Sequence, residues 1–139
     1  MKIIKIFILA TLFLNANLTK IDNRVIDDKT NLQWQDDGNV STTKTNWKDA
    51  INFCENLELD NYKDWRLPNI VELSSIIDDT KNKPLISNIF KNNKAADFWS
   101  STTKANDSNS AWIVIFNKGI QYFRGKSEKN YVRCVRGGI

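Results

Sequence analysis

Apolar positions in the last third of the chain predict an antiparallel sheet. Residues 111–116 read Ala-Trp-Ile-Val-Ile-Phe, so both faces of an extended strand are apolar, which indicates a buried central strand. The triplet Asn117-Lys118-Gly119 fits a short hairpin loop with glycine in the left-handed position. The chain then returns over residues 120–124, and residues 131–136 are expected to form a last strand that carries Cys134.

Two helices are predicted in the middle of the chain. Asn46 can cap the first, with Asp49 three positions on, and Asn69 can cap the second, which follows Pro68 and has Glu72 three positions on. Both segments repeat apolar side chains at helical spacing: Trp47, Ala50/Ile51, Cys54 and Leu57 in the first, and Ile70, Leu73 and Ile76/Ile77 in the second. Cys54 is therefore expected on a buried helix face.

Nearer the N-terminus, residues 25–26 and 32–35 predict short strands around a turn. A helical turn near residues 85–90 is also compatible with the pattern, within an otherwise long irregular stretch. Helices segregated from an antiparallel sheet predict an α+β domain, with two helices packed on a small twisted sheet and long irregular loops. We expect one domain over residues 21–139.

The first residues resemble a secretory signal. Met-Lys-Ile-Ile-Lys is followed by an uncharged apolar run over residues 6–14 and then by Asn15-Ala16-Asn17. We predict a signal peptide over residues 1–17, cut after Ala16 or within the next few residues; a buried N-terminal helix and an uncleaved anchor are the alternatives. No membrane span is expected after its removal, because the apolar run is too short for one.

Signal removal also changes the charge. The formal net charge of +4 includes Lys2 and Lys5, and without them 18 basic residues face 16 acidic ones. A domain at +2 is not expected to bind nucleic acid.

The cysteine count suggests covalent closure. Cys54 and Cys134 are the only cysteines, and in an exported chain they predict one disulfide, with two free buried thiols as the alternative. Histidine is absent, which removes the usual general base and the commonest metal ligand.

A series of short motifs gives a family resemblance. The motifs are Leu32-Gln33-Trp34-Gln35, Trp47…Ala50…Cys54…Leu57, Asp64-Trp65-Arg66-Leu67-Pro68-Asn69…Glu72-Leu73, Phe98-Trp99-Ser100-Ser101-Thr102, Ala111-Trp112, and Tyr131-Val132-Arg133-Cys134-Val135-Arg136-Gly137-Gly138. Together, over about residues 25–138, they resemble the bacterial domain family named after the C-terminal domain of the Legionella collagen-like adhesin.

The resemblance implies a C-type-lectin-like fold, in which a disulfide from a helix to the last strand is usual. It also implies adhesion to sulphated polysaccharides such as glycosaminoglycans, as in the namesake. The calcium-and-sugar signature of true C-type lectins is missing, because no glutamate precedes Pro68 and no Trp-Asn-Asp triplet occurs. Calcium-dependent sugar binding is therefore not expected.

Structural roles are predicted for most residues of these motifs. Large aromatic side chains dominate small cores, and Trp34, Trp47, Trp65 and Trp112 sit among apolar neighbours. Arg66, beside Asp64 and just before Pro68, is expected to bridge a carboxylate or carbonyl groups, with ligand contact as the alternative. Arg136 is expected to be a second structural arginine, on the strand face of Cys134.

Ligand binding is predicted for a basic group near the C-terminus. Its members are Lys118, Arg124, Lys126, Lys129 and Arg133, with Trp99 as the tryptophan most open to a ligand. Such a patch suits sulphate or carboxylate groups, although a merely solvated face is the alternative.

No metal, cofactor or catalytic residue is predicted. The acidic pairs Asp27-Asp28, Asp36-Asp37 and Asp78-Asp79 lack the alternating spacing of calcium loops, and nothing marks two carboxylates as a glycosidase pair. The sequence therefore predicts a non-catalytic adhesion module of the periplasm or cell surface, with a polyanionic glycan or a surface protein as partner. The alternatives are a structural subunit of an envelope or surface assembly, and an enzyme.

Overall fold

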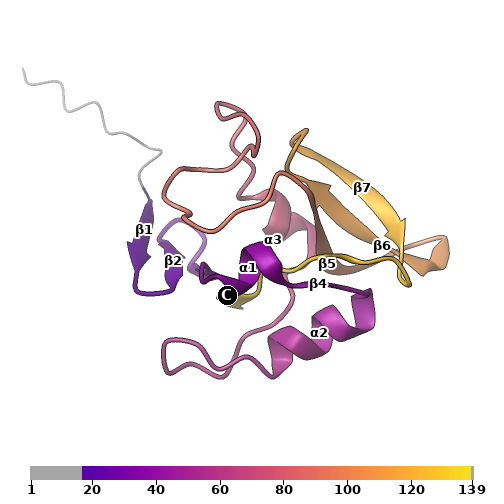
Figure 1. Cartoon of the computed structure of the whole chain (residues 1–139), viewed down its shortest axis with the longest axis horizontal. Helices are drawn as coiled ribbons and strands as arrows, with labels where there is room; N and C mark the ends of the chain where they lie inside the picture. Colours follow the sequence, from indigo (N-terminus) through magenta and orange to yellow (C-terminus); the bar gives the residue numbers. More distant parts are fainter. Residues whose placement is uncertain (1–16, 139) are drawn as a thin grey trace, which may run out of the picture.

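The computed structural model describes residues 17–138, which form an antiparallel sheet, a mixed sheet in which β5 and β8 are parallel, and three short helices (Figure 1). In chain order the elements are β1 (Leu18–Ile21), β2 (Arg24–Asp27), β3 (Leu32–Gln35), α1 (Asn39–Thr42), β4 (Lys44–Thr45), α2 (Trp47–Glu55), α3 (Ile70–Ser74), β5 (Asp97–Lys104), β6 (Asp107–Ile115), β7 (Ile120–Gly125), β8 (Asn130–Tyr131) and β9 (Val135–Gly137). The predicted signal peptide lies almost wholly outside the described residues.

The first sheet has the order β1-β2-β3-β9 and joins both ends of the described chain. Its register pairs Trp34 of β3 with Val135 of β9, both fully buried. The second sheet has the order β4-β8-β5-β6-β7, so β6 lies between two partners as the apolar pattern of residues 111–116 predicted. The hairpin into β7 turns at Gly119, whose φ of +68° is a conformation that favours glycine.

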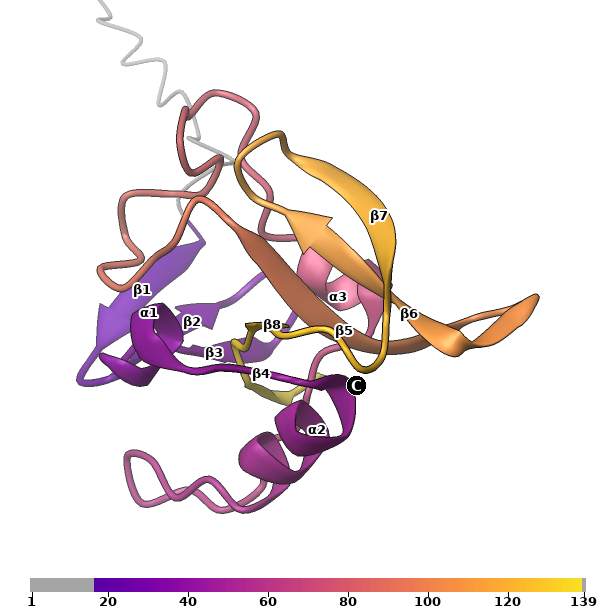
Figure 2. The same cartoon turned by 45° about the vertical axis from the view of Figure 1, so that its right-hand side comes forward.

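The predicted helix starts are confirmed. Asn46 accepts a hydrogen bond from the amide of Asp49, and Asn69 forms a reciprocal capping box with Glu72. The second predicted helix is α3, and it ends at Ser74. Ile76 and Ile77 of its predicted apolar stripe therefore lie outside the helix. Figure 2 shows α2 and α3 on different sides of β5.

Two apolar clusters fill the domain because neighbouring side chains of β5 and β6 point in opposite directions. Phe98 and Val114 belong to the cluster around Trp34 and Leu73, with the first sheet and α3. Trp99 and Ile113 belong to the other cluster, with α2 and the disulfide. The second sheet therefore separates two cores.

The cysteines of the predicted bridge form a disulfide, with Cα atoms 5.4 Å apart. Both cysteines are fully buried, Cys54 on α2 and Cys134 in the extended segment between β8 and β9. The α+β class and the single disulfide are thus confirmed.

Other details of the prediction were wrong. The structure has two sheets instead of one small sheet, and β5 occupies a stretch that was expected to be irregular. The predicted last strand is split into β8 and β9, since each pairs with a different sheet. Residues 85–90 form no helix and contain one hydrogen-bonded turn, from Ser87 to Phe90, and the helix α1 was not predicted.

Candidate binding surface

Trp99 does not lie on a surface, contrary to the prediction. It is fully buried on β5, and its indole Nε1 donates to the carbonyl of Thr45 at 2.8 Å. The polar run Ser100–Thr103 suggested a loop, but these residues extend β5, whose register with β6 is irregular between Trp99 and Thr103. Trp99 is therefore a core residue that ties β5 to β4.

Arg133 was expected in the basic patch and is instead 1% exposed. Its guanidinium donates to the carbonyls of Gln35 and Asn92, both at 2.6 Å, and to the side-chain oxygen of Asn93 at 2.9 Å. Burial lowers its pKa to about 10, against the opposing charge of Asp36. Arg133 thus holds three chain segments together. Its buried side chain cannot contact a ligand at the surface, so the predicted binding role was wrong.

Asp36 is the carboxylate on which these segments converge. Its side chain has no exposed surface and accepts hydrogen bonds from Lys20 and from the backbone amides of Lys91 and Asn92. Burial alone would raise its pKa, but these hydrogen bonds and the charge of Arg133 outweigh burial and hold the pKa below its usual value. The group is therefore a fixed anion in the interior.

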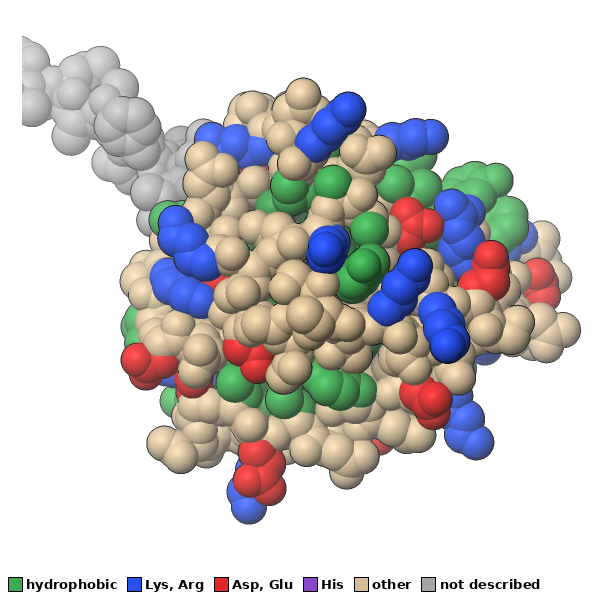
Figure 3. Space-filling view, viewed as in Figure 1, with side chains coloured by type: hydrophobic (Ala, Val, Ile, Leu, Met, Phe, Trp, Pro, Cys, Tyr) green, Lys and Arg blue, Asp and Glu red, His purple; other side chains and the backbone are tan. Residues whose placement is uncertain are grey.

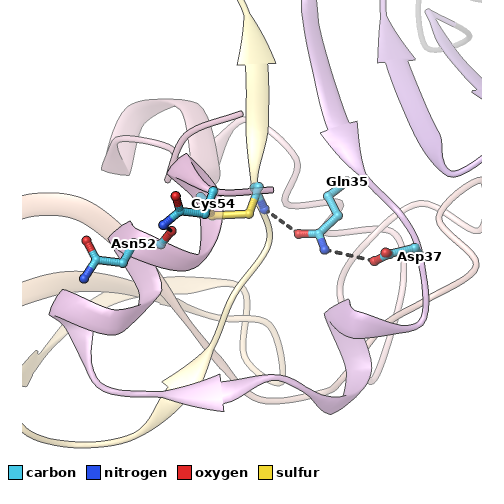
Figure 4. Close-up of a disulfide and its surroundings, with 6 residues drawn as sticks. Gln35, Asp37, Asn52 and Cys54 are labelled. Atoms are coloured by element: carbon cyan, nitrogen blue, oxygen red, sulfur yellow. Dashed lines mark hydrogen bonds between the residues drawn. A yellow bond between two sulfur atoms is a disulfide. The ribbon is translucent and has the colours of Figure 1, made fainter. Parts of the chain in front are cut away.

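A buried hydrogen bond also joins β3 to the backbone of the disulfide cysteine Cys134. The side-chain oxygen of Gln35 accepts from the backbone amide of Cys134 at 2.9 Å, and its nitrogen donates to Asp37 (Figure 4). The cysteine bridge therefore has polar support on the side facing β3.

Trp34, Trp47 and Trp65 lie in or against the cores, whereas Trp112, for which a core role was predicted, belongs to neither core cluster. Trp34 is fully buried and Trp65 is 2% exposed. Trp47 is half-buried and donates to the carbonyl of Ser100 at 2.9 Å, and Trp112 packs edge-on against Phe123. Pro68 is also buried, and its carbonyl accepts from the amide of Ser101.

Both arginines with predicted structural roles form side-chain ion pairs, and the partner of Arg66 is Glu72 and not the neighbouring Asp64. Arg66 forms a bidentate pair with Glu72, at 2.6 and 2.7 Å, and donates to the carbonyl of Gly137. It is Arg136 that pairs with Asp64, at 2.7 Å, with its guanidinium 3.6 Å from the ring centroid of Tyr62. Hydrogen bonding raises the pKa of Arg66 and, with the charge of Arg136, lowers that of Asp64.

The remaining members of the basic group do not form one patch. Lys118 is exposed at the start of β7 and Lys126 follows its end, so a six-residue strand of about 20 Å separates them. Arg124 is half-buried and pairs with Asp97 at 3.0 Å. Of the predicted group, Lys126 and Lys129 share the loop between β7 and β8.

Lys126 is held in a defined position. Its Nζ lies 3.9 Å from the ring centroid of Trp47 and donates to the hydroxyl of Thr103 at 2.9 Å. Its backbone carbonyl accepts from the amide of Trp47, and its own amide donates to the carbonyl of Asn109. The lysine is thereby fixed between α2, β5 and β6.

One further lysine that the sequence did not single out lies at the same end of the second sheet as Lys126. Lys104 ends β5, one position after the Thr103 that Lys126 contacts, and its Nζ lies 4.7 Å from the ring centroid of Phe123. Lys44 of β4 lies over Tyr131 near the opposite end of β5, because Tyr131 pairs with Phe98. We call Lys104, Lys126 and Lys129 the Lys126 surface.

An acidic group also borders this surface. Asp107 accepts from Ser110 at 2.7 Å, and this bond, with smaller effects of Lys104 and Lys126, lowers its pKa. Figure 3 shows basic side chains spread over one face of the molecule among acidic and neutral ones. Positive charge on this face is therefore confined to small groups of side chains and does not form one continuous basic patch.

A hollow with a volume of about 460 Å³ lies elsewhere, beside the C-terminal end of α3, and Asp27, Asp78, Asp79 and Lys29 are among the residues that line it. Within residues 17–138 no group of three or more acidic or cysteine side chains is placed to hold a metal ion. No helix of this part of the chain is long and apolar enough to cross a membrane.

Comparison with known proteins identifies the family. The model of the family described as the Lcl C-terminal domain matches residues 23–136. Among curated proteins no match is found.

Proposed function

We propose that this chain, which belongs to the Lcl C-terminal domain family, is an extracytoplasmic, non-catalytic module that binds a sulphated or acidic glycan through the Lys126 surface. The family suggests a domain associated with bacterial adhesion, and the disulfide suits an oxidising compartment, the periplasm or the cell surface. Sulphated polysaccharides are the ligand class that the sequence resemblance implies.

The observation that carries the proposal is the fixed ammonium group of Lys126. Contacts with the Trp47 ring and the Thr103 hydroxyl hold this long side chain in place before a ligand arrives. The side chain then loses less conformational entropy when a ligand binds. The aromatic ring does not neutralise the ammonium group, so its positive charge can still attract an anion. Lys104 likewise lies over an aromatic ring, that of Phe123.

Several side chains of the types that act in catalysis already form covalent bonds or ion pairs within the domain. Both cysteines form the disulfide, and the chain has no histidine. Asp36, Asp64 and Glu72 are each paired with an arginine or lysine, and the pKa of each is lowered. This supports a binding role over an enzymatic one.

A second candidate is a subunit of a surface assembly. The observation that favours it is the edge strand β7, which exposes Ile120 and Tyr122 to 45% each. An apolar edge can pair with a strand of another chain. Sedimentation analysis of the purified domain distinguishes the two, since a glycan-binding monomer stays monomeric at high concentration.

The glycan proposal is tested by chromatography on heparin over a salt gradient. The variant Lys104→Glu, Lys126→Gln, Lys129→Glu is expected to elute at markedly lower salt than the parent, because attraction to a polyanion is screened by ions. The matched control, Lys29→Glu, Lys63→Gln, Lys118→Glu, changes charge equally on other surfaces. Equal retention of both variants would show that only net charge matters and would refute the proposed surface; thermal unfolding verifies that both are folded.

A further inference from the structure

We propose that Asn39 is an acceptor for N-linked glycosylation during export, and that the modification precedes folding. Asn39-Val40-Ser41 is an Asn-X-Ser sequon, the acceptor motif that oligosaccharyltransferases read in exported chains. Asp37 stands two positions before Asn39, and the proposal includes recognition of this acidic side chain by the enzyme. The proposed recognition segment is therefore Asp37-Gly38-Asn39-Val40-Ser41.

The folded protein has room for a glycan at this position. Asn39 begins the short helix α1, and its side chain is exposed, with Asp37 as its hydrogen-bond partner at 3.2 Å. Gly38 beside it is exposed and has no atom within 4 Å of an added Cβ. In Figures 1 and 2, α1 lies on the outside of the molecule, where no other element passes over it. A sugar on Asn39 therefore displaces no packed side chain.

The chemistry requires only the asparagine amide and one co-reactant, a lipid-pyrophosphate-linked oligosaccharide. The side-chain nitrogen of Asn39 forms a bond to the anomeric carbon of the first sugar. The bond from that carbon to the pyrophosphate oxygen breaks, and the lipid pyrophosphate leaves with its electron pair. The nitrogen loses one proton to the enzyme or to solvent, so no oxidant or reductant is needed.

The rest of the motif is closed to an enzyme once the protein has folded. Val40 is fully buried in the core cluster around Trp34, and the hydroxyl of Ser41 donates to the carbonyl of Gly38 at 3.1 Å. An enzyme that reads the serine hydroxyl has to break this bond and pull Val40 from the core. The motif is therefore accessible in the newly exported chain and poorly accessible after folding.

Two other sequons of the chain serve as internal controls. Asn106-Asp107-Ser108 lies at the β5–β6 turn with an exposed asparagine, but Lys104 stands at its acidic position. Asn17-Leu18-Thr19 is preceded at that position by Asn15. Exposure alone therefore does not single out Asn39, whereas the acidic residue does.

The first test is intact-mass analysis of the full chain exported from a host that carries a bacterial oligosaccharyltransferase and its lipid-linked oligosaccharide. We expect the mass to rise by one oligosaccharide in the parent and in Asn106→Gln, and no rise in Asn39→Gln or Asp37→Ala. Thermal unfolding of Asn39→Gln should match the unmodified parent. An unmodified parent in a host that modifies a known acceptor, or an increment that persists in Asn39→Gln, would overturn the proposal.

The second test addresses timing. Purified enzyme and the lipid-linked oligosaccharide are incubated with the unmodified full chain, either native or reduced and unfolded. Opening a packed segment limits access, so the unfolded chain should be modified at least about tenfold faster. Equal rates would show that the folded site is open and would refute modification before folding.

Discussion

The guanidinium of Arg133 lies 3.4 Å from the carboxylate of Asp36, and neither side chain reaches solvent. Arg133 directly precedes the disulfide cysteine Cys134, and Asp36 directly follows β3. Arg133 also lies 4.6 Å from the ring centroid of Phe90, in the long segment before β5. One buried ion pair thereby joins three parts of the chain that are remote in sequence.

Replacing Arg133 should be strongly destabilising. Arg133→Met leaves the carbonyls of Gln35 and Asn92 without their donor and weakens the pairing of a buried carboxylate. We expect the free energy of unfolding in urea to fall by about 3 kcal/mol. The control is Arg136→Met, where the partner Asp64 is largely exposed and the expected loss is smaller. Similar losses in the two variants would contradict the assigned role of Arg133.

Asp36 should make the domain acid-sensitive. Because its pKa is lower in the folded protein than the value of about 3.9 in an unfolded chain, its contribution to stability is complete at neutral pH and disappears as the pH falls through the folded pKa. We expect the melting temperature to drop steeply below about pH 4. Asp36→Asn should flatten this dependence, whereas Asp28→Asn, at an exposed side chain, should keep it. A parental slope in Asp36→Asn would refute the assignment.

The disulfide should account for a large share of the stability. It closes a loop across 80 positions, and the chain-entropy model gives about 4.5 kcal/mol for a loop of that length. The double variant Cys54→Ala, Cys134→Ala should therefore unfold at a much lower urea concentration than the oxidised parent. The reduced parent is the matched control. Midpoints unchanged by reduction would disprove this contribution.

Arg66→Lys should have a smaller effect. Lysine retains the charge but cannot bind both oxygens of Glu72 and the carbonyl of Gly137 at once. Because the side chain of Arg66 is 40% exposed, water compensates part of the loss, and we expect about 1 kcal/mol. Retention on heparin should stay the same in the folded fraction. A variant with unchanged melting temperature and lost retention would place Arg66 in the binding surface.

Local signals in the sequence were sufficient for several elements. The caps Asn46 and Asn69 could be recognised because a capping box involves residues three positions apart. Gly119 marked its hairpin because few other residues adopt a positive φ at low energy. These interactions involve residues that are close in sequence, so they can be predicted without knowing the tertiary structure.

The binding group could not be read in the same way. Lys118 and Lys126 are close in sequence but stand at opposite ends of a strand, whereas Lys104, remote in sequence, lies next to the Thr103 that Lys126 contacts. Trp99 precedes a polar run in the sequence and Arg133 stands between Val132 and Cys134, yet both side chains are buried. Nothing local distinguishes an arginine that faces solvent from one that faces Asp36.

The sequence by itself therefore determined the α+β class, the helix starts, the central strand, the cysteine bridge and the family, because these depend on periodicity, short-range hydrogen bonds and a single pair of thiols. Only the tertiary structure decided which charges are buried. That outcome depends on how β8 and β9 divide between two sheets, which carries Arg133 inward to Asp36 and leaves Lys126 outside on Trp47.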